Sequence, residues 1–389
     1  MRILVFVNHY LPGYRSGGPL RTIVNMVENL GDEFEFLIVT RDRDFGDSEP
    51  YNNVKIDQWN EVGKAKVFYT STSMFSVTGF KEILNATPYD VLYLNSFFSP
   101  HSTGALLLLR RFGFVKAKSI VIAPRGEFSP GALGLKAAKK RIYIPVAKLL
   151  RMYHGLIWQA SSEYEAQDIR NVLGSIAREI LVAPNLLSVA PAVKNADCQH
   201  SEDKARGNRL RLVFLSRISP MKNLDYLLTI LKRVNSPIDF LIYGPLEVPE
   251  YWAACKKLID ALPENINVKY RGELTPAEVT TVFAAHDVFF LPTRGENFGH
   301  VIFESLAAGT CVVISDQTQW EADKNGAVEV IPLDDVDAWT ASVERWVARS
   351  QEDLTKCREA ALTYARDYVA KSPAVEQNRA LFKFAYNYR

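Results

Sequence analysis

Two glutamates separated by seven residues, Glu296 and Glu304, could bind a sugar. Both lie in the segment ENFGHVIFESLAAG. Each carboxylate can accept hydrogen bonds from vicinal hydroxyl groups. The segment predicts a helix that begins near Gly299 and carries Glu304 on the same face as His300 and Val301. Backbone amides at such a helix start attract an anion. A phosphate held there would place a ribose near Glu304 and a second sugar near Glu296, whereas the alternative is two solvated glutamates.

Two cations precede these glutamates in the segment LSRISPMKNLDYLL. An apolar run ends at Arg217, and a short loop then leads through Lys222 to the next expected helix. Cations at the carboxyl end of a strand can neutralise a diphosphate and stabilise the charge of a leaving group. The alternative is an ordinary surface pair. Because Asp42–Asp44 and Asp334–Asp335 are unconvincing metal ligands in their contexts, we expect neither a metal nor another cofactor.

A glycine pair, Gly17 and Gly18, precedes another expected helix in SGGPLRTIVNMVENLG. Pro19 suits the first helical turn, apolar residues follow at helical spacing, and Gly31 fits just past the helix end. Glycines at a helix start let backbone amides approach an anion closely, although a flexible loop is the alternative. The loop before this pair is too long for a GxGxxG dinucleotide fingerprint, which disfavours a hydride-transfer enzyme.

Short β-rich apolar runs alternate with amphipathic segments along the 389 residues, a length that favours two domains. The strands expected in the first half are Ile3–Val7, Phe34–Val39, Val91–Asn95, Ser119–Ala123 and Leu156–Gln159. The polar segment Val193–Asn208 has the composition of a linker. After it the pattern restarts with the strand segments RLRLVFLS, IDFLIYG, NVKYRG, DVFFLP and TCVVIS, and with a helix from Leu224.

This alternation predicts parallel sheets that are covered by helices on both faces. We therefore expect an α/β protein with two Rossmann-like, doubly wound domains that face each other across a cleft. The domains would comprise residues 1–190 and 209–369, with the helical residues 370–389 able to pack back on the first domain. Ligands of such sheets lie beyond the carboxyl ends of the strands.

The composition and the N-terminal residues favour a cytoplasmic protein. The start, MRILVFVNHY, is predicted to be a first strand because its apolar run is too short for a signal peptide, and no run reaches the length of a membrane span. Four scattered cysteines predict reduced thiols, with neither a zinc knuckle nor a CxxC pair.

The positive charge is concentrated in residues 101–160, where eleven Lys and Arg residues stand against one acid, Glu127. A solvated helix face, a surface for an anionic lipid or acceptor, and a nucleic-acid surface are the alternatives, and no recognition motif supports the last. We favour a peripheral contact of Arg110–Arg151 with an anionic membrane. Electrostatics should dominate this contact, because some of the interspersed apolar residues must pack in the core.

The spacing of Glu296 and Glu304 resembles the E-x7-E signature of retaining family-4 glycosyltransferases, which have the GT-B fold. The segment SGGP resembles the glycine pair of that family, SRISPMKN its Arg…Lys diphosphate clamp, and LVAPN the segment before its interdomain linker. The resemblance spans nearly the whole chain and implies that Glu296 contacts the donor sugar, Glu304 the ribose, and Arg217 with Lys222 the diphosphate. The other residues that it places at the donor are Arg271, Leu274, Phe298, Gly299, His300 and Val301.

The chain departs from the family in its N-terminal half. Where many relatives carry a histidine, the segment APRGEF places Arg125 and Glu127, and we expect Arg125 to take part in catalysis. Leu186 stands where the family has a glycine. His9 and His101 follow expected strands and could line the cleft or be structural.

The resemblance implies transfer of a hexosyl group, with retention, from a nucleotide-diphosphate sugar, with a UDP-sugar favoured. The acceptor would be a hydroxyl of a saccharide or lipid-linked molecule in the assembly of a surface polysaccharide, lipopolysaccharide or capsule. Two other enzyme types share the fold, a sugar-nucleotide epimerase and a phosphorylase. A two-domain sugar-binding protein without catalytic activity is the alternative outside the enzymes.

Overall fold

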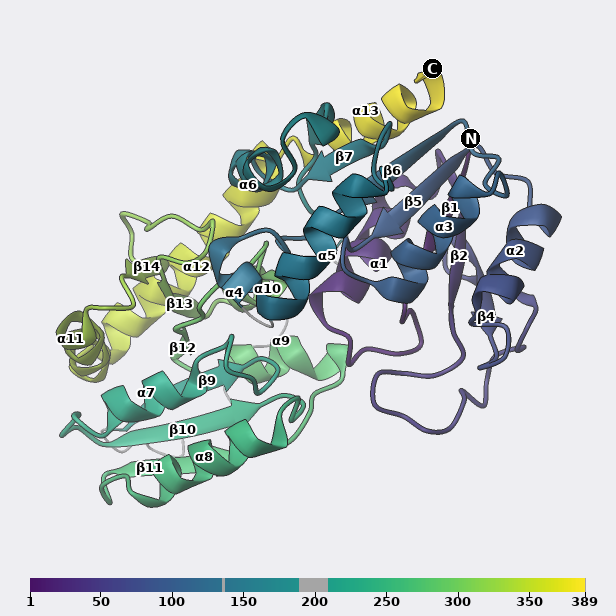
Figure 1. The fold of residues 1–389 in the computed structure, drawn as a ribbon. Coiled ribbons are helices and arrows are strands. Elements are labelled where there is room, and N and C mark those ends of the chain that lie inside the picture. The colour runs from purple at the N-terminus through teal and green to yellow at the C-terminus, as the bar shows by residue number, and fades with distance from the viewer. Residues whose placement is uncertain (135–136, 189–208, 389) are drawn as a thin grey trace. The chain divides into compact units, whose positions relative to one another are not determined.

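The computed structural model describes residues 1–134, 137–188 and 209–388, which form two compact units (Figure 1). The N-terminal unit comprises residues 1–189 and 372–389, and the C-terminal unit comprises residues 190–371. Each unit is built on a largely parallel sheet with helices, which confirms the expected α/β fold with two Rossmann-like domains. The expected linker Val193–Asn208 lies outside the described residues.

The N-terminal unit has an eight-stranded sheet in the order β3-β4-β2-β1-β5-β6-β7-β8. Every residue of β5 and β6 is buried, as is typical of parallel strands covered on both faces. Only the pair β3 and β4 is antiparallel among the described pairings. The strands are β1 (Arg2–Phe6), β2 (Glu35–Arg41), β3 (Trp59–Val62), β4 (Ala65–Thr70), β5 (Val91–Asn95), β6 (Ser119–Ala123), β7 (Ile157–Ala160) and β8 (Glu179–Val182).

Two apolar cores cover the two faces of this sheet. One contains residues of α1 and α13, and the other contains residues of α2, α3, α5 and α6. The helix α13 follows the C-terminal unit in sequence but packs here, where Phe382 contacts Phe34 and Phe36. The helices are α1 (Gly18–Leu30), α2 (Val77–Ala86), η1 (Pro100–Ala105), α3 (Leu106–Arg111), α4 (Pro130–Gly134), α5 (Ala137–Leu149), α6 (Glu163–Leu173), η2 (Gly174–Ile176) and α13 (Ala374–Asn387).

The C-terminal unit has a six-stranded parallel sheet in the order β11-β10-β9-β12-β13-β14. The chain order reverses between β9 and β12, and ligands of such sheets bind beyond the strand ends at this switch point. The strands are β9 (Leu210–Leu215), β10 (Ile238–Tyr243), β11 (Ile266–Tyr270), β12 (Val288–Leu291), β13 (Cys311–Ser315) and β14 (Val328–Ile331). The helices are α7 (Leu224–Leu231), α8 (Pro249–Asp260), α9 (Pro276–Ala284), α10 (His300–Ala307), α11 (Val336–Val347) and α12 (Gln351–Lys371).

Four strands were not expected from the sequence, namely β3, β4, β8 and β14. The two-residue turn Gly63-Lys64 joins β3 to β4, and Gly63 adopts the positive φ of 57° that such a turn requires. This hairpin makes the sheet mixed rather than purely parallel. Within the described residues, no helix combines the length and apolar character needed to cross a bilayer.

Candidate functional site

Lys222 and Glu296 form an ion pair at the switch point of the C-terminal sheet. Lys222 lies in the loop after β9 and Glu296 in the loop after β12, and these neighbouring parallel strands end at the same sheet edge. The ammonium group of Lys222 donates a hydrogen bond to the Glu296 carboxylate. Only 10% of the Lys222 side chain and 11% of the Glu296 side chain are exposed. The structure therefore brings two of the expected site residues into direct contact.

A set of hydrogen bonds joins the two loops that carry this ion pair. The Arg294 amide and the Thr293 hydroxyl both donate to the Met221 carbonyl, at 2.8 and 3.1 Å. The Arg294 guanidinium donates to the side-chain oxygen of Asn223 at 2.9 Å, and the Ser315 hydroxyl donates to the Thr293 carbonyl. These five residues hold Lys222 and Glu296 in register, and the sequence analysis did not identify them.

The helix α10 begins next to Glu296 at an uncapped glycine. Gly299 precedes its first residue with φ of 75°, and no side chain caps the helix start. A Cβ atom at Gly299 would lie 2.8 Å from Cδ1 of Ile302. Both this close contact and the positive φ favour glycine at the position. The helix starts at His300, close to the predicted start near Gly299, and the backbone N–H groups of an uncapped first turn are suited to bind an anion.

Aromatic packing fixes the segment in front of α10. The indole N–H of Trp320 donates to the Phe298 carbonyl at 2.6 Å, and the two rings lie 5.4 Å apart. The ring of Tyr368 stacks on Trp320 at 4.9 Å. Phe298 is therefore a buried anchor of the loop, and only its backbone is suited to hold a ligand. Glu304 follows on α10 and is partly buried.

Arg217 is paired with an acid that the sequence analysis missed. Its guanidinium contacts the Glu247 carboxylate at 2.7 Å, and Glu247 lies in the loop after β10. Gly244 permits this approach, because a Cβ atom there would lie 1.9 Å from the Ser216 carbonyl oxygen. The φ of 131° at Gly244 is also one that other residues rarely adopt. The loops after β9 and β10 thus meet only because position 244 is glycine.

The loop after β11 continues the same sheet edge. The Arg271 amide donates to the Ile242 carbonyl at 2.9 Å, and the Gly244 amide donates to the Gly272 carbonyl at 2.8 Å. The Arg271 side chain is exposed, and Leu274 is partly buried. The structure therefore places Arg271 and Leu274 on the β10 side of Arg217, and Glu296 on the other side.

The glycine pair belongs to the N-terminal unit. Gly17 adopts a φ of 67° and precedes α1, and Gly18 is the first helical residue with Pro19 in the first turn. A Cβ atom built at Gly17 or Gly18 meets no atom within 4 Å. Packing therefore does not explain the pair, and a role in approaching a ligand stays a prediction.

Arg125 lies at the carboxyl end of β6, held by neutral partners. It donates to the side-chain oxygens of Asn95 and Asn185 and to the Tyr93 hydroxyl, the first at 2.9 Å. Its φ of 57° is unusual for a residue with a side chain. Because none of these partners is a carboxylate, the positive charge of Arg125 can still attract an anion. Residues with an unusual backbone φ cluster at functional sites.

Glu127 organises the loop at the end of β5. Its carboxylate accepts hydrogen bonds from the Ser96 hydroxyl at 2.7 Å and from the Phe97 and Phe98 amides. Ser96 has a φ of 123°, which lies in the region that favours glycine. Burial raises the pKa of Glu127, and these hydrogen bonds together with Lys140 oppose the shift. Glu127 therefore fixes two strained loops beside Arg125.

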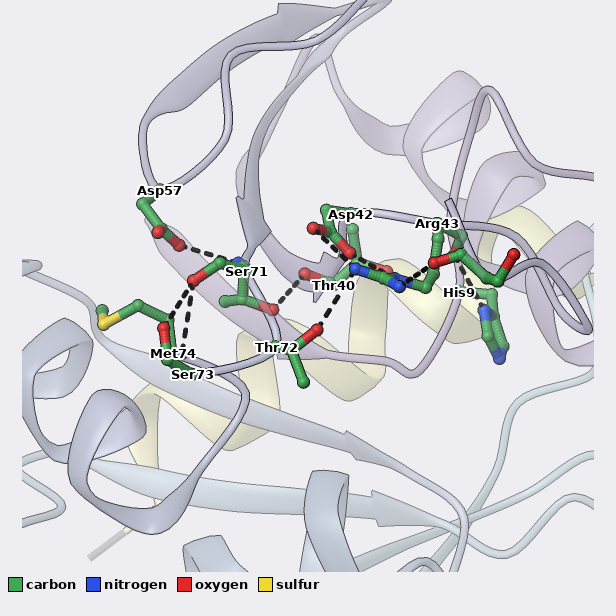
Figure 2. Close-up of polar contacts among 11 residues, drawn as sticks. His9, Thr40, Asp42, Arg43, Asp57, Ser71, Thr72, Ser73 and Met74 are labelled. Atoms are coloured by element: carbon green, nitrogen blue, oxygen red, sulfur yellow. Dashed lines mark hydrogen bonds and ion pairs between the residues drawn. The ribbon is translucent and has the colours of Figure 1, made fainter. Parts of the chain in front are cut away.

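Figure 2 shows a second polar network at the carboxyl ends of β1, β2 and β4. The Arg43 guanidinium contacts Asp42 at 2.8 Å and Thr72 at 3.2 Å, and its carbonyl lies 3.2 Å from Nδ1 of His9. Burial is the main cause of the lowered pKa of His9. His101, in contrast, is exposed and stacks on a phenylalanine ring. The network joins three loops at one edge of the sheet, and the Arg43 carbonyl gives His9 a structural partner within it.

Comparisons with known proteins match the part of the chain that carries this site. Residues 197–363, which contain Arg217, Lys222, Glu296 and Glu304, match the family described as glycosyl transferases group 1. The matched segment therefore makes the C-terminal unit similar to that family. The two-unit architecture is the GT-B fold that the resemblance implied.

Two curated relatives and a solved structure resemble longer parts of the chain. An uncharacterised 41.2 kDa protein in the cps region of Klebsiella pneumoniae is 25% identical over 270 residues, which are 66% of this chain and 72% of that protein. A phosphatidyl-myo-inositol mannosyltransferase of Mycolicibacterium smegmatis is 30% identical over 205 residues, half of either chain. The Anabaena protein HepE, solved with UDP-glucose, has a TM-score of 0.68 at 16% identity over 98% of both chains.

Proposed function

We propose that the protein is a retaining, metal-independent family-4 glycosyltransferase that moves a hexosyl group from a nucleotide-diphosphate sugar to a hydroxyl acceptor. The Lys222–Glu296 ion pair at the switch point carries this proposal. It places a cation for phosphate and a carboxylate for sugar hydroxyls side by side, next to the uncapped start of α10.

The donor would lie along the edge of the C-terminal sheet. Arg217 and Lys222 would bind the diphosphate together with the first amides of α10, and Glu304 would accept hydrogen bonds from the ribose. Arg271 and Leu274, on the β10 side of Arg217, would lie near the base. Lys222 would then be shared between the phosphate and Glu296, which keeps the carboxylate oriented toward the sugar.

Catalysis would rest on stabilising the leaving diphosphate. Two cations and a helix start provide fixed positive charge where negative charge develops, and such groups need little reorganisation. Glu296 is bound to Lys222, so it suits the binding of sugar hydroxyls better than nucleophilic attack. We infer front-face attack by the acceptor hydroxyl, with a phosphate oxygen of the leaving group as base. From the N-terminal unit, Arg125 would contribute its charge to the reaction.

A UDP-sugar is the donor we favour, because HepE, which shares the fold, was solved with UDP-glucose. The relative in a cps region and the relative that acts as a mannosyltransferase support a saccharide or lipid-linked acceptor in surface polysaccharide assembly. A mannose donor with a different base is the second choice, on the strength of the latter relative.

The decisive experiment is incubation of the protein with UDP-glucose, UDP-galactose, UDP-N-acetylglucosamine or GDP-mannose without an acceptor, followed by ¹H NMR. We expect slow hydrolysis of one donor that first releases the sugar in the anomeric configuration of that donor. Conversion of the intact donor into another nucleotide sugar would instead identify an epimerase. Release of the opposite anomer would contradict retention, and binding of a donor without any turnover over days would favour a sugar-binding protein.

A further inference from the structure

The helix α5 of the N-terminal unit is apolar on two faces. Its inner face packs in the core of the unit through Tyr143, Ile144 and Ala147. Its other apolar residues, Ile142, Val146 and Leu149, follow at spacings of four and three residues and therefore share the opposite face. A globular protein needs only one apolar face on a surface helix, so the second face calls for an explanation.

The second face of α5 is exposed to an unusual degree. The exposed fractions are 69% for Ile142, 47% for Val146, 82% for Leu149 and 56% for Leu150, which follows the helix directly. We name these four residues the outer stripe. The sequence analysis expected some of the apolar residues here to pack in the core, and Ile144 and Tyr153 do so, whereas the outer stripe remains exposed. Large side chains exposed together mark an interaction surface.

Cations surround the outer stripe. Lys139 and Arg141 on α5 and Arg151 just after it are exposed. The residues 128–162 contain no Asp or Glu, so no acid of this segment compensates their charge. The guanidinium of Arg110, at the end of α3, donates at 2.8 Å to the carbonyl of His154, which lies three residues along the chain from Arg151. Lys136 of the same basic segment lies outside the described residues.

We propose that the outer stripe and its cations dock the N-terminal unit on an anionic lipid bilayer, with α5 lying in the plane of the headgroups. A helix with exposed apolar residues flanked by Lys and Arg binds such an interface by inserting the former and pairing the latter with lipid phosphates. A second copy of this chain would bring two cationic surfaces together, which repel each other. The charge therefore selects an anionic surface as the occupant.

The proposal predicts two separable contributions to binding. Each cation near an anionic surface increases the affinity about fivefold, and salt screens this contribution. Each large apolar residue that leaves water increases it about tenfold or more, with little dependence on salt. Contact through charge alone would show only the first contribution.

The test is co-sedimentation of the full chain with phosphatidylcholine vesicles that contain either no anionic lipid or about one third phosphatidylglycerol. Four double variants accompany the wild type. Leu149→Ser/Leu150→Ser changes the stripe, and Lys139→Gln/Arg141→Gln changes the cations. The matched controls change similarly exposed residues elsewhere: Tyr164→Ser/Val369→Ser for the apolar pair and Lys256→Gln/Lys257→Gln for the cations.

We expect the wild type and both controls to bind the anionic vesicles much more tightly than the neutral ones. The stripe variant should lose about a hundredfold in affinity at low salt, because two apolar residues are changed. The cation variant should lose about 25-fold and show a weaker salt dependence. Recovery of the wild type in the supernatant with anionic vesicles would overturn the proposal. Binding of the stripe variant at wild-type affinity would overturn it too. So would a wild-type protein that binds no vesicles but forms a dimer, if Leu149→Ser/Leu150→Ser dissociates that dimer.

Discussion

Replacing Glu296 by glutamine tests the ion pair at the centre of the site. The change keeps the size of the side chain but removes the charge that faces Lys222, which is only 10% exposed. Loss of one partner from a fully buried pair costs about 3–5 kcal/mol. Because the amide oxygen of glutamine can still accept a hydrogen bond, we expect about 1–3 kcal/mol here. In a unit of this size that loss lowers the melting temperature by several degrees.

A diphosphate should reverse this loss, since it supplies the anion that Lys222 lacks in the variant. UDP should therefore raise the melting temperature of Glu296→Gln by more than it raises that of the wild type. The variant should therefore bind UDP more tightly than the wild type, by up to about tenfold, which corresponds to about 1.4 kcal/mol. Donor hydrolysis should fall at least about a hundredfold, because a contact with the sugar worth about 2.7 kcal/mol is lost.

Differential scanning fluorimetry and calorimetry with UDP measure both effects. The matched control is Glu247→Gln, which removes an acid from Arg217 at a more exposed position, with 28% of the Glu247 side chain accessible. Exposed pairs contribute at most about 1 kcal/mol, so this variant should keep its melting temperature. Loss of UDP affinity in Glu296→Gln, at an unchanged melting temperature, would refute the assignment of Glu296 to the sugar.

Three further predictions concern the diphosphate, the metal and the acceptor side. Arg217→Ala should weaken UDP about 10- to 100-fold and uridine hardly at all, because one charged hydrogen bond contributes about 1.5–3 kcal/mol; equal affinities of variant and wild type for UDP in calorimetry would speak against the clamp. Turnover should survive excess EDTA, and a loss that Mg²⁺ or Mn²⁺ restores would contradict metal independence. Burial raises the pKa of Glu127 above its ordinary 4.5, so its contribution to stability is fully present below that pH and is lost as the pH rises through the folded-state pKa. Urea unfolding between pH 4 and 8 should therefore show the wild type losing stability relative to Glu127→Gln as the pH rises, and parallel curves would exclude this shift.

The central strands and the α10 segment could be predicted because their signals are local. The largely apolar runs of β5, β6 and β13 predict strands by themselves, and Gly299 and Gly309 mark both ends of α10. Lys222 and Glu296 could be placed together because both follow parallel strands. The edge strands β3 and β8 were missed because each has only four residues, and these are mostly half-buried.

The supporting contacts of the site could not be predicted, because they join residues far apart in sequence. Thr293 and Met221 are 72 residues apart, and nothing in the local sequence of either indicates the other. The pair of Arg217 and Glu247 depends on how closely two loops approach at Gly244. The outer stripe illustrates another limit, since both faces of α5 are apolar and periodicity cannot tell which one faces the core.

The most direct test of the proposed donor site is a thermal-shift screen of nucleotide sugars on the wild type and Arg217→Ala. A ligand at a hundred times its dissociation constant adds about 2.7 kcal/mol of stability. In a unit of roughly 180 residues this corresponds to a rise of about 5–10 °C. We predict such a rise for at least one nucleotide-diphosphate sugar with the wild type, and a much smaller one with Arg217→Ala. A screen in which no nucleotide sugar changes the melting temperature of the wild type, or in which both proteins respond equally, would contradict a donor site at the switch point of the C-terminal sheet.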